Sequence, residues 1–219
     1  MQINAVIFDL DGTLVDSIEG ITFAMNRVLE SRGFPGHDRD TYRALVGNGL
    51  RELTRRAAPE EAAADDRLVD EMFALMKEEY GRSWSVGMRV YDGIPGLLDR
   101  LTEEGVPFAV NTNKEEAISR RIIAECLPDW EFSAVAGGGA QSRKKPDPEG
   151  ALRIASSVGV EPGLCAYVGD SEVDILTARN AGMFEVSVTW GFRSERELIS
   201  AGARRIIRRP AELLALIGL

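Results

Sequence analysis

The chain has 219 residues, of which 44% are apolar and 28% charged, and its formal net charge is −9. This length suits one large domain or a core with a smaller insert, and the composition is typical of a globular protein. The negative charge argues against nonspecific binding to nucleic acid or an anionic membrane, so an anionic substrate needs local cations, a metal or backbone amides.

Cysteine and histidine usage narrows the chemistry further. Cys126 and Cys165 form neither a metal-type spacing nor a disulfide framework, and His37, the only histidine, lies in a polar stretch that predicts a solvated loop. A serine–histidine triad is therefore disfavoured. No signal-type segment or membrane span is recognisable, so we expect a cytoplasmic protein, either a monomer or a homodimer.

The chain opens with the apolar run 3–8, which predicts a buried strand. Asp9 and Asp11 follow it, and side chains two residues apart on an extended chain face the same way. Two carboxylates this close repel one another unless a cation lies between them or one is protonated. Gly12 then permits a sharp turn or the close approach of a ligand. The pattern indicates a carboxylate nucleophile assisted by a metal.

Within residues 17–88 the sequence pattern predicts helices and no strands. Apolar residues recur at helical spacing over 18–29 and 68–80, and the segment 45–50 has the composition of a turn between helices. We therefore expect a small helical domain at 17–88, inserted into a core made of residues 1–16 and 89–219.

From residue 91 onward, strand-like and helix-like segments alternate. The predicted strands cover 108–112, 132–136, 165–168 and 184–188, and the predicted helices cover 95–104, 114–126, 148–158, 171–181, 195–202 and 210–218. This alternation predicts an α/β fold, a Rossmann-like parallel sheet with helices on both faces. In such folds the chemistry lies at the carboxyl ends of the strands.

Polar residues follow four of these predicted strands. They are Asp9 and Asp11, then Thr112 and Asn113, then Lys145, and finally Asp170 and Asp174. Taken singly, each group is an ordinary turn, helix cap or solvated surface residue. Because all four groups are expected along one edge of the sheet, we interpret them together as a single site.

The whole chain resembles the haloacid dehalogenase superfamily, in its phosphatase branch. The resemblance rests on residues 9–17 (DLDGTLVDS), 111–113 (NTN), 145–148 (KPDP) and Gly169-Asp170 with Asp174. The helical insert is similar to the cap domain of many members. The resemblance implies a Mg²⁺-dependent phosphatase that hydrolyses a small phosphorylated metabolite through an aspartyl-phosphate intermediate.

The resemblance also implies a role for each matching residue. Asp9 is the nucleophile, and Asp11 is the general acid to the leaving alkoxide and then the general base to water. Asp9, Asp170 and the Asp11 backbone carbonyl are the expected Mg²⁺ ligands, and Asp174 is expected to support the metal or its waters. The expected phosphoryl contacts are Lys145, Thr112, Asn113 and Gly12.

Within the insert, residues 46–51 resemble the cap segment of phosphoglycolate phosphatases, which makes 2-phosphoglycolate a candidate substrate. The amides of Gly47, Asn48 and Gly49 would bind an anion at a helix start, and Arg51 would clamp a carboxylate. A plain turn between helices with a surface arginine explains the same residues equally well.

Three alternative functions are considered, and the residues argue against each of them to a different degree. Sugar phosphomutases of the β-phosphoglucomutase type resemble this chain, but they are expected to have a histidine about where Ile21 stands. Response-regulator receivers also form aspartyl-phosphates, but they have no helical insert. A non-catalytic binding module has no support, because no catalytic position is missing. The basic residues between Arg204 and Arg209 predict a solvated face.

Overall fold

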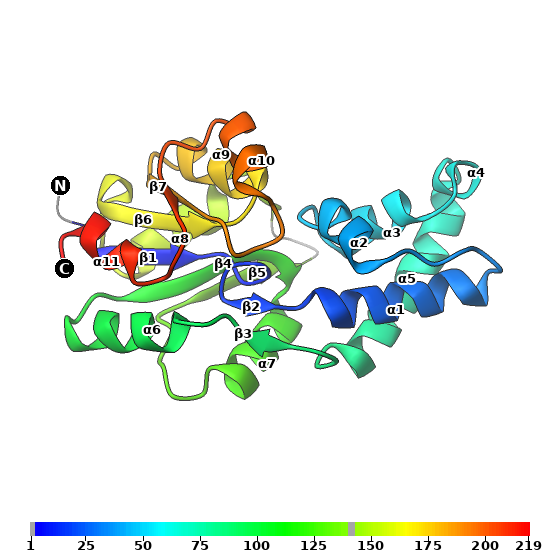
Figure 1. Ribbon diagram of the computed structural model, residues 1–219, viewed down its shortest axis with the longest axis horizontal. Coiled ribbons are helices and arrows are strands. Elements are labelled where there is room, and N and C mark those ends of the chain that lie inside the picture. The colour runs from blue at the N-terminus through cyan, green and yellow to red at the C-terminus, as the bar shows by residue number, and fades with distance from the viewer. Residues whose placement is uncertain (1–2, 140–142) are drawn as a thin grey trace. The chain divides into compact units, whose positions relative to one another are not determined.

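A computed structural model describes residues 3–139 and 143–219, and they form two compact units (Figure 1). One unit consists of the described residues 3–15, 90–139 and 143–219, and the other of residues 16–89. The chain crosses between the units at two short paired strands, β2 (Val15–Asp16) and β3 (Arg89–Val90).

The first unit is built on a six-stranded sheet in which every strand pair is parallel. The strand order is β5–β4–β1–β6–β7–β8, with β1 at Ala5–Phe8, β4 at Phe108–Glu115, β5 at Val135–Gly138, β6 at Cys165–Gly169, β7 at Phe184–Val188 and β8 at Ile206–Ile207. Strands β1 and β6 are buried along their whole length, because helices cover both faces of the sheet.

The helices of this unit are α6 (Ile94–Glu103), α7 (Glu116–Cys126), α8 (Glu149–Ser157), α9 (Glu172–Asn180), α10 (Glu195–Ser200) and α11 (Glu212–Ile217), with a 3₁₀ turn at Pro162–Leu164. Figure 1 shows α6 and α7 on one face and α9 and α10 on the other. Small residues of α8 and α9, such as Ala151 and Ala178, pack with Ile7 and Tyr167 in one buried cluster. The Rossmann-like α/β core expected from the sequence is confirmed.

The second unit contains only helices between its two bordering strands. They are α1 (Ile18–Ser31), α2 (Arg39–Leu45), α3 (Leu50–Ala57), α4 (Glu60–Ala63) and α5 (Asp66–Ser83). Helices α1 and α5 bury Met25, Leu29, Met72 and Met76, whose spacing matches the apolar pattern of the sequence. His37 lies in the loop between α1 and α2, as expected, but it is half-buried, and its Nε2 lies 2.8 Å from the Ala57 carbonyl oxygen.

Several element bounds differ from the prediction near the polar residues. Strand β4 continues to Glu115, whereas the sequence predicts its end at Thr112. Strand β5 lies at Val135–Gly138 rather than 132–136. The glycines explain both shifts, because a Cβ at Gly137 would lie 2.4 Å from the Glu116 Cα and one at Gly138 would lie 2.8 Å from the Asn113 carbonyl oxygen. They permit a close approach of the two chains where the sequence suggests a break.

Two further details differ from the prediction. Helix α8 begins at Glu149, one residue after the predicted start, so Lys145 lies four residues before its helix. Prolines lack the amide hydrogen of a helix interior, and Pro148 instead occupies the N-cap. The two-residue strand β8 lies inside the basic stretch 204–209, where flanking arginines conceal the strand pattern.

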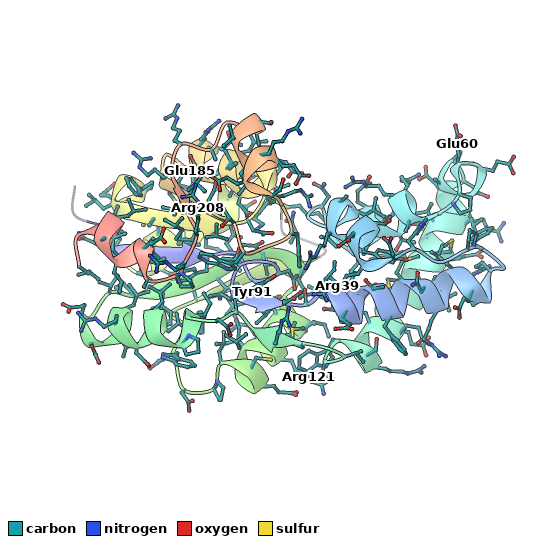
Figure 2. The ribbon with its side chains drawn as sticks, viewed as in Figure 1. Arg39, Glu60, Tyr91, Arg121, Glu185 and Arg208 are labelled. Carbon is teal, nitrogen blue, oxygen red and sulfur yellow. The ribbon has the colours of Figure 1, made fainter. Side chains whose placement is uncertain are left out.

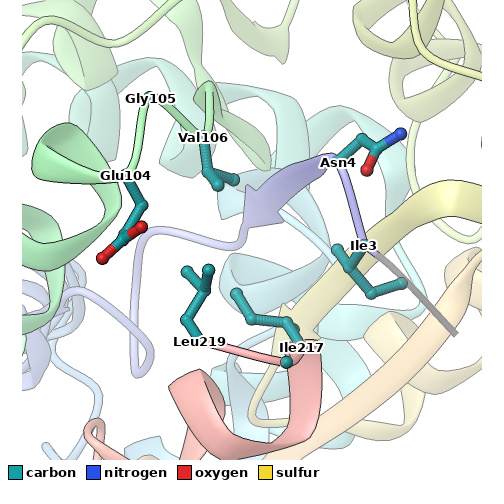
Figure 3. Close-up of a pocket in the computed structure, with 8 residues that line it drawn as sticks. Ile3, Asn4, Glu104, Gly105, Val106, Ile217 and Leu219 are labelled. Carbon is teal, nitrogen blue, oxygen red and sulfur yellow. The ribbon is translucent and has the colours of Figure 1, made fainter.

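A cavity of about 630 Å³ lies at the amino-terminal end of β1 (Figure 3). Its lining includes Ile3, Asn4, Val106, Ile217 and Leu219. The polar residues discussed below follow the opposite end of β1, so this cavity is not part of their site. Across the described part of the chain, no helix is both long and apolar enough to cross a bilayer.

Candidate active site

Three aspartates meet at the carboxyl ends of β1 and β6. Asp9 directly follows β1, Asp170 directly follows β6, and Asp174 lies in the first turn of α9. All three are buried, and each offers a carboxylate oxygen within 4.8 Å of the others. The adjacent pairing of β1 and β6 creates this cluster, because the two strands end side by side.

Lys145 supplies the positive charge of the cluster. Its Nζ lies 2.8 Å from Asp9 Oδ1 and 2.7 Å from Asp174 Oδ1, and only 4% of its side chain is exposed. Burial alone would lower the pKa of Lys145, but the carboxylates of Asp174 and Asp9 hold it well above its usual range. The ammonium group therefore stays charged between two carboxylates.

Asn113 fixes the position of Lys145. The Asn113 Oδ1 accepts a hydrogen bond from the Lys145 amide at 2.8 Å, and its Nδ2 donates to the Lys145 carbonyl oxygen at 3.2 Å. One side chain on β4 thereby holds the backbone of a residue 32 positions later. Asn113 has this structural role in addition to the phosphoryl contact that the sequence suggests for its amide.

Burial and crowding shift the acid–base behaviour of two aspartates. Burial, with Asp174 and Asp11 nearby and Lys145 opposing them, raises the pKa of Asp9 to about 7. Burial, followed by the charges of Asp174 and Asp9, also raises the pKa of Asp170 well above its usual range. Both pKa shifts come first from burial and then from the neighbouring carboxylates, and a bound cation would oppose both causes.

The surroundings of Asp170 leave little freedom for its side chain. A Cβ at Gly12, where φ is +85°, would lie 2.3 Å from Asp170 Oδ2, and one at Gly191 would lie 2.4 Å from the Asp170 Cβ. The Phe192 amide donates to Asp170 Oδ2 at 2.7 Å. The amide of Gly12 donates to the Val15 carbonyl oxygen, so Gly12 acts here through its lack of a side chain.

Ser171 and Lys145 together fix the carboxylate of Asp174. The backbone amide and hydroxyl of Ser171 both donate to Asp174 Oδ2, at 3.1 Å and 2.6 Å. With Lys145 on Oδ1, both carboxylate oxygens of Asp174 have partners. Asp9 Oδ1 is buried and lies 2.8 Å from the same Lys145 Nζ, but this contact is not aligned as a hydrogen bond. Asp9 therefore retains capacity for a cation, while Asp174 is suited to a supporting position.

Asp11 lies at the edge of the cluster, against a second lysine. Lys114 Nζ lies 2.9 Å from Asp11 Oδ2, and the two side chains are 4% and 19% exposed. Thr112, two residues before Lys114 on β4, is buried as well, and its hydroxyl accepts from the Lys114 amide at 3.2 Å. Strand β4 thus brings the Lys114 side chain to Asp11, and the Thr112 hydroxyl binds the backbone of the same lysine.

The formal charges of the site fit a divalent cation. Four carboxylates, those of Asp9, Asp11, Asp170 and Asp174, face two ammonium groups, those of Lys114 and Lys145. A doubly charged cation would complete the balance. Hard oxygen donors of this kind are the ligands that Mg²⁺ takes in proteins.

Comparison with known proteins agrees with this arrangement. The family profile of the haloacid dehalogenase-like hydrolases matches residues 6–188. The chain belongs to the haloacid dehalogenase-like hydrolase family. The phosphoglycolate phosphatase of Xanthomonas campestris pv. campestris is 34% identical over 211 residues, which are 95% of this chain and 94% of that protein. That of Pseudomonas putida is 35% identical over 196 residues, 88% of this chain and 72% of that protein.

Solved structures of the family superimpose closely. A protein of Lactobacillus delbrueckii subsp. bulgaricus gives a TM-score of 0.92 at 29% identity, over 99% of both chains. A protein of Haemophilus somnus gives 0.90 at 26% identity, over 99% of this chain and 98% of that one. Like its phosphatase relatives, the chain is a phosphoric monoester hydrolase.

The candidate substrate-binding residues 47–49 and Arg51 all lie in the helical unit, and the ion-pair partners of Arg51 belong to that unit too. Gly47, Asn48 and Gly49 connect α2 to α3, and Gly49, with φ +82°, is the N-cap of α3. The Arg51 side chain lies 2.7 Å from Asp70 Oδ1 and 3.4 Å from Asp66 Oδ1. These ion pairs account for Arg51 without a substrate, so its role as a carboxylate clamp stays a prediction.

The sequence interpretation missed Lys114, Ser171 and the Phe192 amide. Lys114 was assigned to the first residue of a helix, although its position two residues after Thr112 is a signal for the same face of a strand. Ser171 was legible as a helix cap with Asp174 three residues later. The Phe192 contact depends on a backbone atom 22 residues from Asp170 and leaves no trace in the sequence.

Proposed function

We propose that the enzyme hydrolyses a small phosphate monoester through phosphorylation of Asp9, with Mg²⁺ as its cofactor. The observation that carries the proposal is the position of the Asp9 carboxylate. It is buried at the end of β1, in contact with the Lys145 ammonium group and near the Asp170 and Asp174 oxygens. A carboxylate attacks a phosphoryl group only where nearby cations offset the repulsion between the two anions.

The reaction proceeds in two displacement steps. In the first step, an Asp9 oxygen forms a bond to phosphorus while the bond from phosphorus to the ester oxygen breaks, and Asp11 protonates the departing alkoxide. In the second step, Asp11 takes a proton from water, whose oxygen attacks the phosphorus of the aspartyl-phosphate and releases phosphate and Asp9. The two carboxylates suit these roles because Asp9 is buried, whereas Asp11 lies at the partly exposed edge of the site.

The remaining residues bind and neutralise the phosphoryl group. Lys145, the Thr112 hydroxyl and the Asn113 amide would contact its oxygens, on which the charge of the transition state is spread. Asp9, Asp170 and the Asp11 carbonyl would hold Mg²⁺, and Asp174 would support it. When bound, Mg²⁺ would withdraw charge from the phosphoryl oxygens and increase the electrophilicity of phosphorus.

For the substrate we propose 2-phosphoglycolate. The support is that relatives 34–35% identical over most of this chain are known as phosphoglycolate phosphatases. We propose that residues 16–89 form the cap that selects the leaving group. A phosphomutase is disfavoured because Ile21, about where such enzymes are expected to have a histidine, is a buried apolar residue of α1.

The test is phosphate release from 2-phosphoglycolate, hexose phosphates and nucleoside monophosphates, each with Mg²⁺ and with EDTA. We expect multiple turnovers that require Mg²⁺, with 2-phosphoglycolate the preferred ester. Isomerisation of a sugar phosphate without phosphate release would contradict the hydrolase assignment. Turnover of another ester in preference to 2-phosphoglycolate would contradict only the substrate.

A further inference from the structure

Lys114 is a buried, charged residue of the site, and the reaction proposed above gives it no role. Its side chain is 4% exposed, and its Nζ lies 2.9 Å from Asp11 Oδ2. Lysine is among the residues least often buried, and burial of its charge is tolerated only beside a partner. The pair with Asp11 therefore accounts for the buried position of this ammonium group.

The backbone around Lys114 is built to direct the side chain inward. The pairing of β4 with β5 shifts register between Asn111 and Glu115, and such irregularities re-aim side chains near active sites. The strand is held in this path by the close approach of Gly138, where a Cβ would lie 2.8 Å from the Asn113 carbonyl oxygen. The fold thus fixes the origin of the Lys114 side chain.

Asp11 needs such a partner more than the other aspartates of the site. Its side chain is 19% exposed, compared with 11% for Asp9 and 3% for Asp174. A carboxyl group at the edge of a site can adopt several rotamers, and only one of them points at a leaving oxygen. A misplacement of about 1 Å can reduce a rate by about a hundredfold.

We propose that Lys114 is a positioning residue, which holds the Asp11 carboxyl group in the rotamer that protonates the leaving alkoxide. This inference rests on the proposed function, because it assigns Lys114 to the acid–base half of that reaction. Lys145 serves the nucleophile Asp9, and Lys114 serves Asp11. The two lysines are therefore expected to have different signatures in the kinetics.

The leaving group of the substrate separates the two signatures. An alkyl phosphate releases a strongly basic alkoxide that needs a proton from Asp11. Acetyl phosphate is similarly small but releases acetate, which needs none. A loss of Asp11 positioning should therefore affect the alkyl ester alone, whereas general damage to the site should affect both esters.

The experiment compares kcat/KM for 2-phosphoglycolate, or the best alkyl ester of the panel, with kcat/KM for acetyl phosphate. For each of the two substrates, kcat/KM covers the steps up to and including phosphoryl transfer to Asp9. For Lys114→Met we expect a fall of about a hundredfold with the alkyl ester and less than about threefold with acetyl phosphate. Asp11→Asn should show the same selectivity, and adding Lys114→Met to it should cause little further loss.

Controls make the outcome decisive. Lys144→Met alters an exposed lysine and should match the parent enzyme with both esters. Lys114→Arg keeps the charge and should recover part of the alkyl-ester activity. If Lys114→Met fails to fold, Lys114→Arg carries the test, since its altered reach should still reduce activity with the alkyl ester more than with acetyl phosphate.

Equal losses with both esters in a folded Lys114 variant, or additive losses in the double variant, would overturn the inference. Failure of the proposed function looks different. In that case the parent enzyme would release phosphate from neither ester, or Asp9→Asn would remain active.

Discussion

Lys114 and Lys145 of the sheet unit and Arg51 of the helical unit pair with carboxylates in different settings. Lys114 and Lys145 are 4% exposed, and their partners belong to the site. Arg51 is 35% exposed and pairs with Asp66 and Asp70, which are 79% and 60% exposed. Figure 2 shows that the side chain of Glu60, at the start of α4, also points outward.

The comparison separates charges that carry chemistry from charges that cover a surface. Exposed ion pairs contribute little to stability, because water and salt screen them. Buried pairs lose the solvation of both partners, and apolar residues of similar volume often replace them without loss. Stability alone therefore does not explain two buried lysines beside four aspartates, which agrees with the catalytic roles proposed above. Each of the following experiments tests either the buried charges of the site or the exposed charge of Arg51.

The largest effect is expected from Asp9→Asn. The amide cannot form the acyl-phosphate, so kcat should fall by about 10⁴-fold or more, as for loss of a catalytic nucleophile. Steady-state phosphate release measures the loss, and circular dichroism checks the fold. Asp129→Asn, on the exposed surface before Trp130, is the matched control and should keep full activity. Activity of Asp9→Asn within tenfold of the parent would exclude Asp9 as the nucleophile.

Lys145→Met is expected to come next. The change leaves Asp9 and Asp174 without their ammonium partner, which costs about 3–5 kcal/mol of folding free energy for a buried pair. It should also reduce kcat/KM by about 10²- to 10³-fold with alkyl ester and acetyl phosphate alike, since the neutralised group is the nucleophile. Urea denaturation and kinetics measure the two effects. A selective loss with the alkyl ester would contradict the division of roles between the two lysines.

The pH dependence of Mg²⁺ binding tests the crowding of the aspartates. In the metal-free protein the pKa of Asp9 is raised from 3.8 to about 7. The bound proton therefore stabilises the fold fully below about pH 4, and this stabilisation is lost as the pH rises through 7. Mg²⁺ needs the carboxylate, so its apparent affinity should fall about tenfold from pH 8 to pH 6. Calorimetric titrations at the two pH values that give equal affinities would contradict this picture.

The smallest effect is expected from Arg51→Ala. If Arg51 binds a substrate carboxylate, KM should rise about tenfold for 2-phosphoglycolate and remain nearly unchanged for a neutral alkyl phosphate. The control is Arg67→Ala, which removes a more exposed arginine paired with Glu71. Equal KM changes for both esters would leave Arg51 as a surface ion-pair residue, like its neighbours.

The sequence predicted those parts of the site that depend on local pattern. Asp9 and Asp170 each directly follow a strand whose apolar run is legible, and parallel strands end at one edge of the sheet. Lys114 was not predicted because the extension of β4 depends on the glycines of β5, a tertiary contact. The Phe192 amide was not predicted because any residue can offer its backbone. The cytoplasmic location and the oligomeric state stay predictions.

The central claim is that Asp9 carries the phosphoryl group, and trapping of the intermediate tests it most directly. The enzyme is mixed with substrate and Mg²⁺, quenched in acid within the first turnover, digested and analysed by mass spectrometry. We expect a hydroxylamine-sensitive phosphoryl group on the peptide that contains Asp9, and none in Asp9→Asn. Turnover at the normal rate without a trapped phosphoryl group, or with one on another residue, would contradict the account.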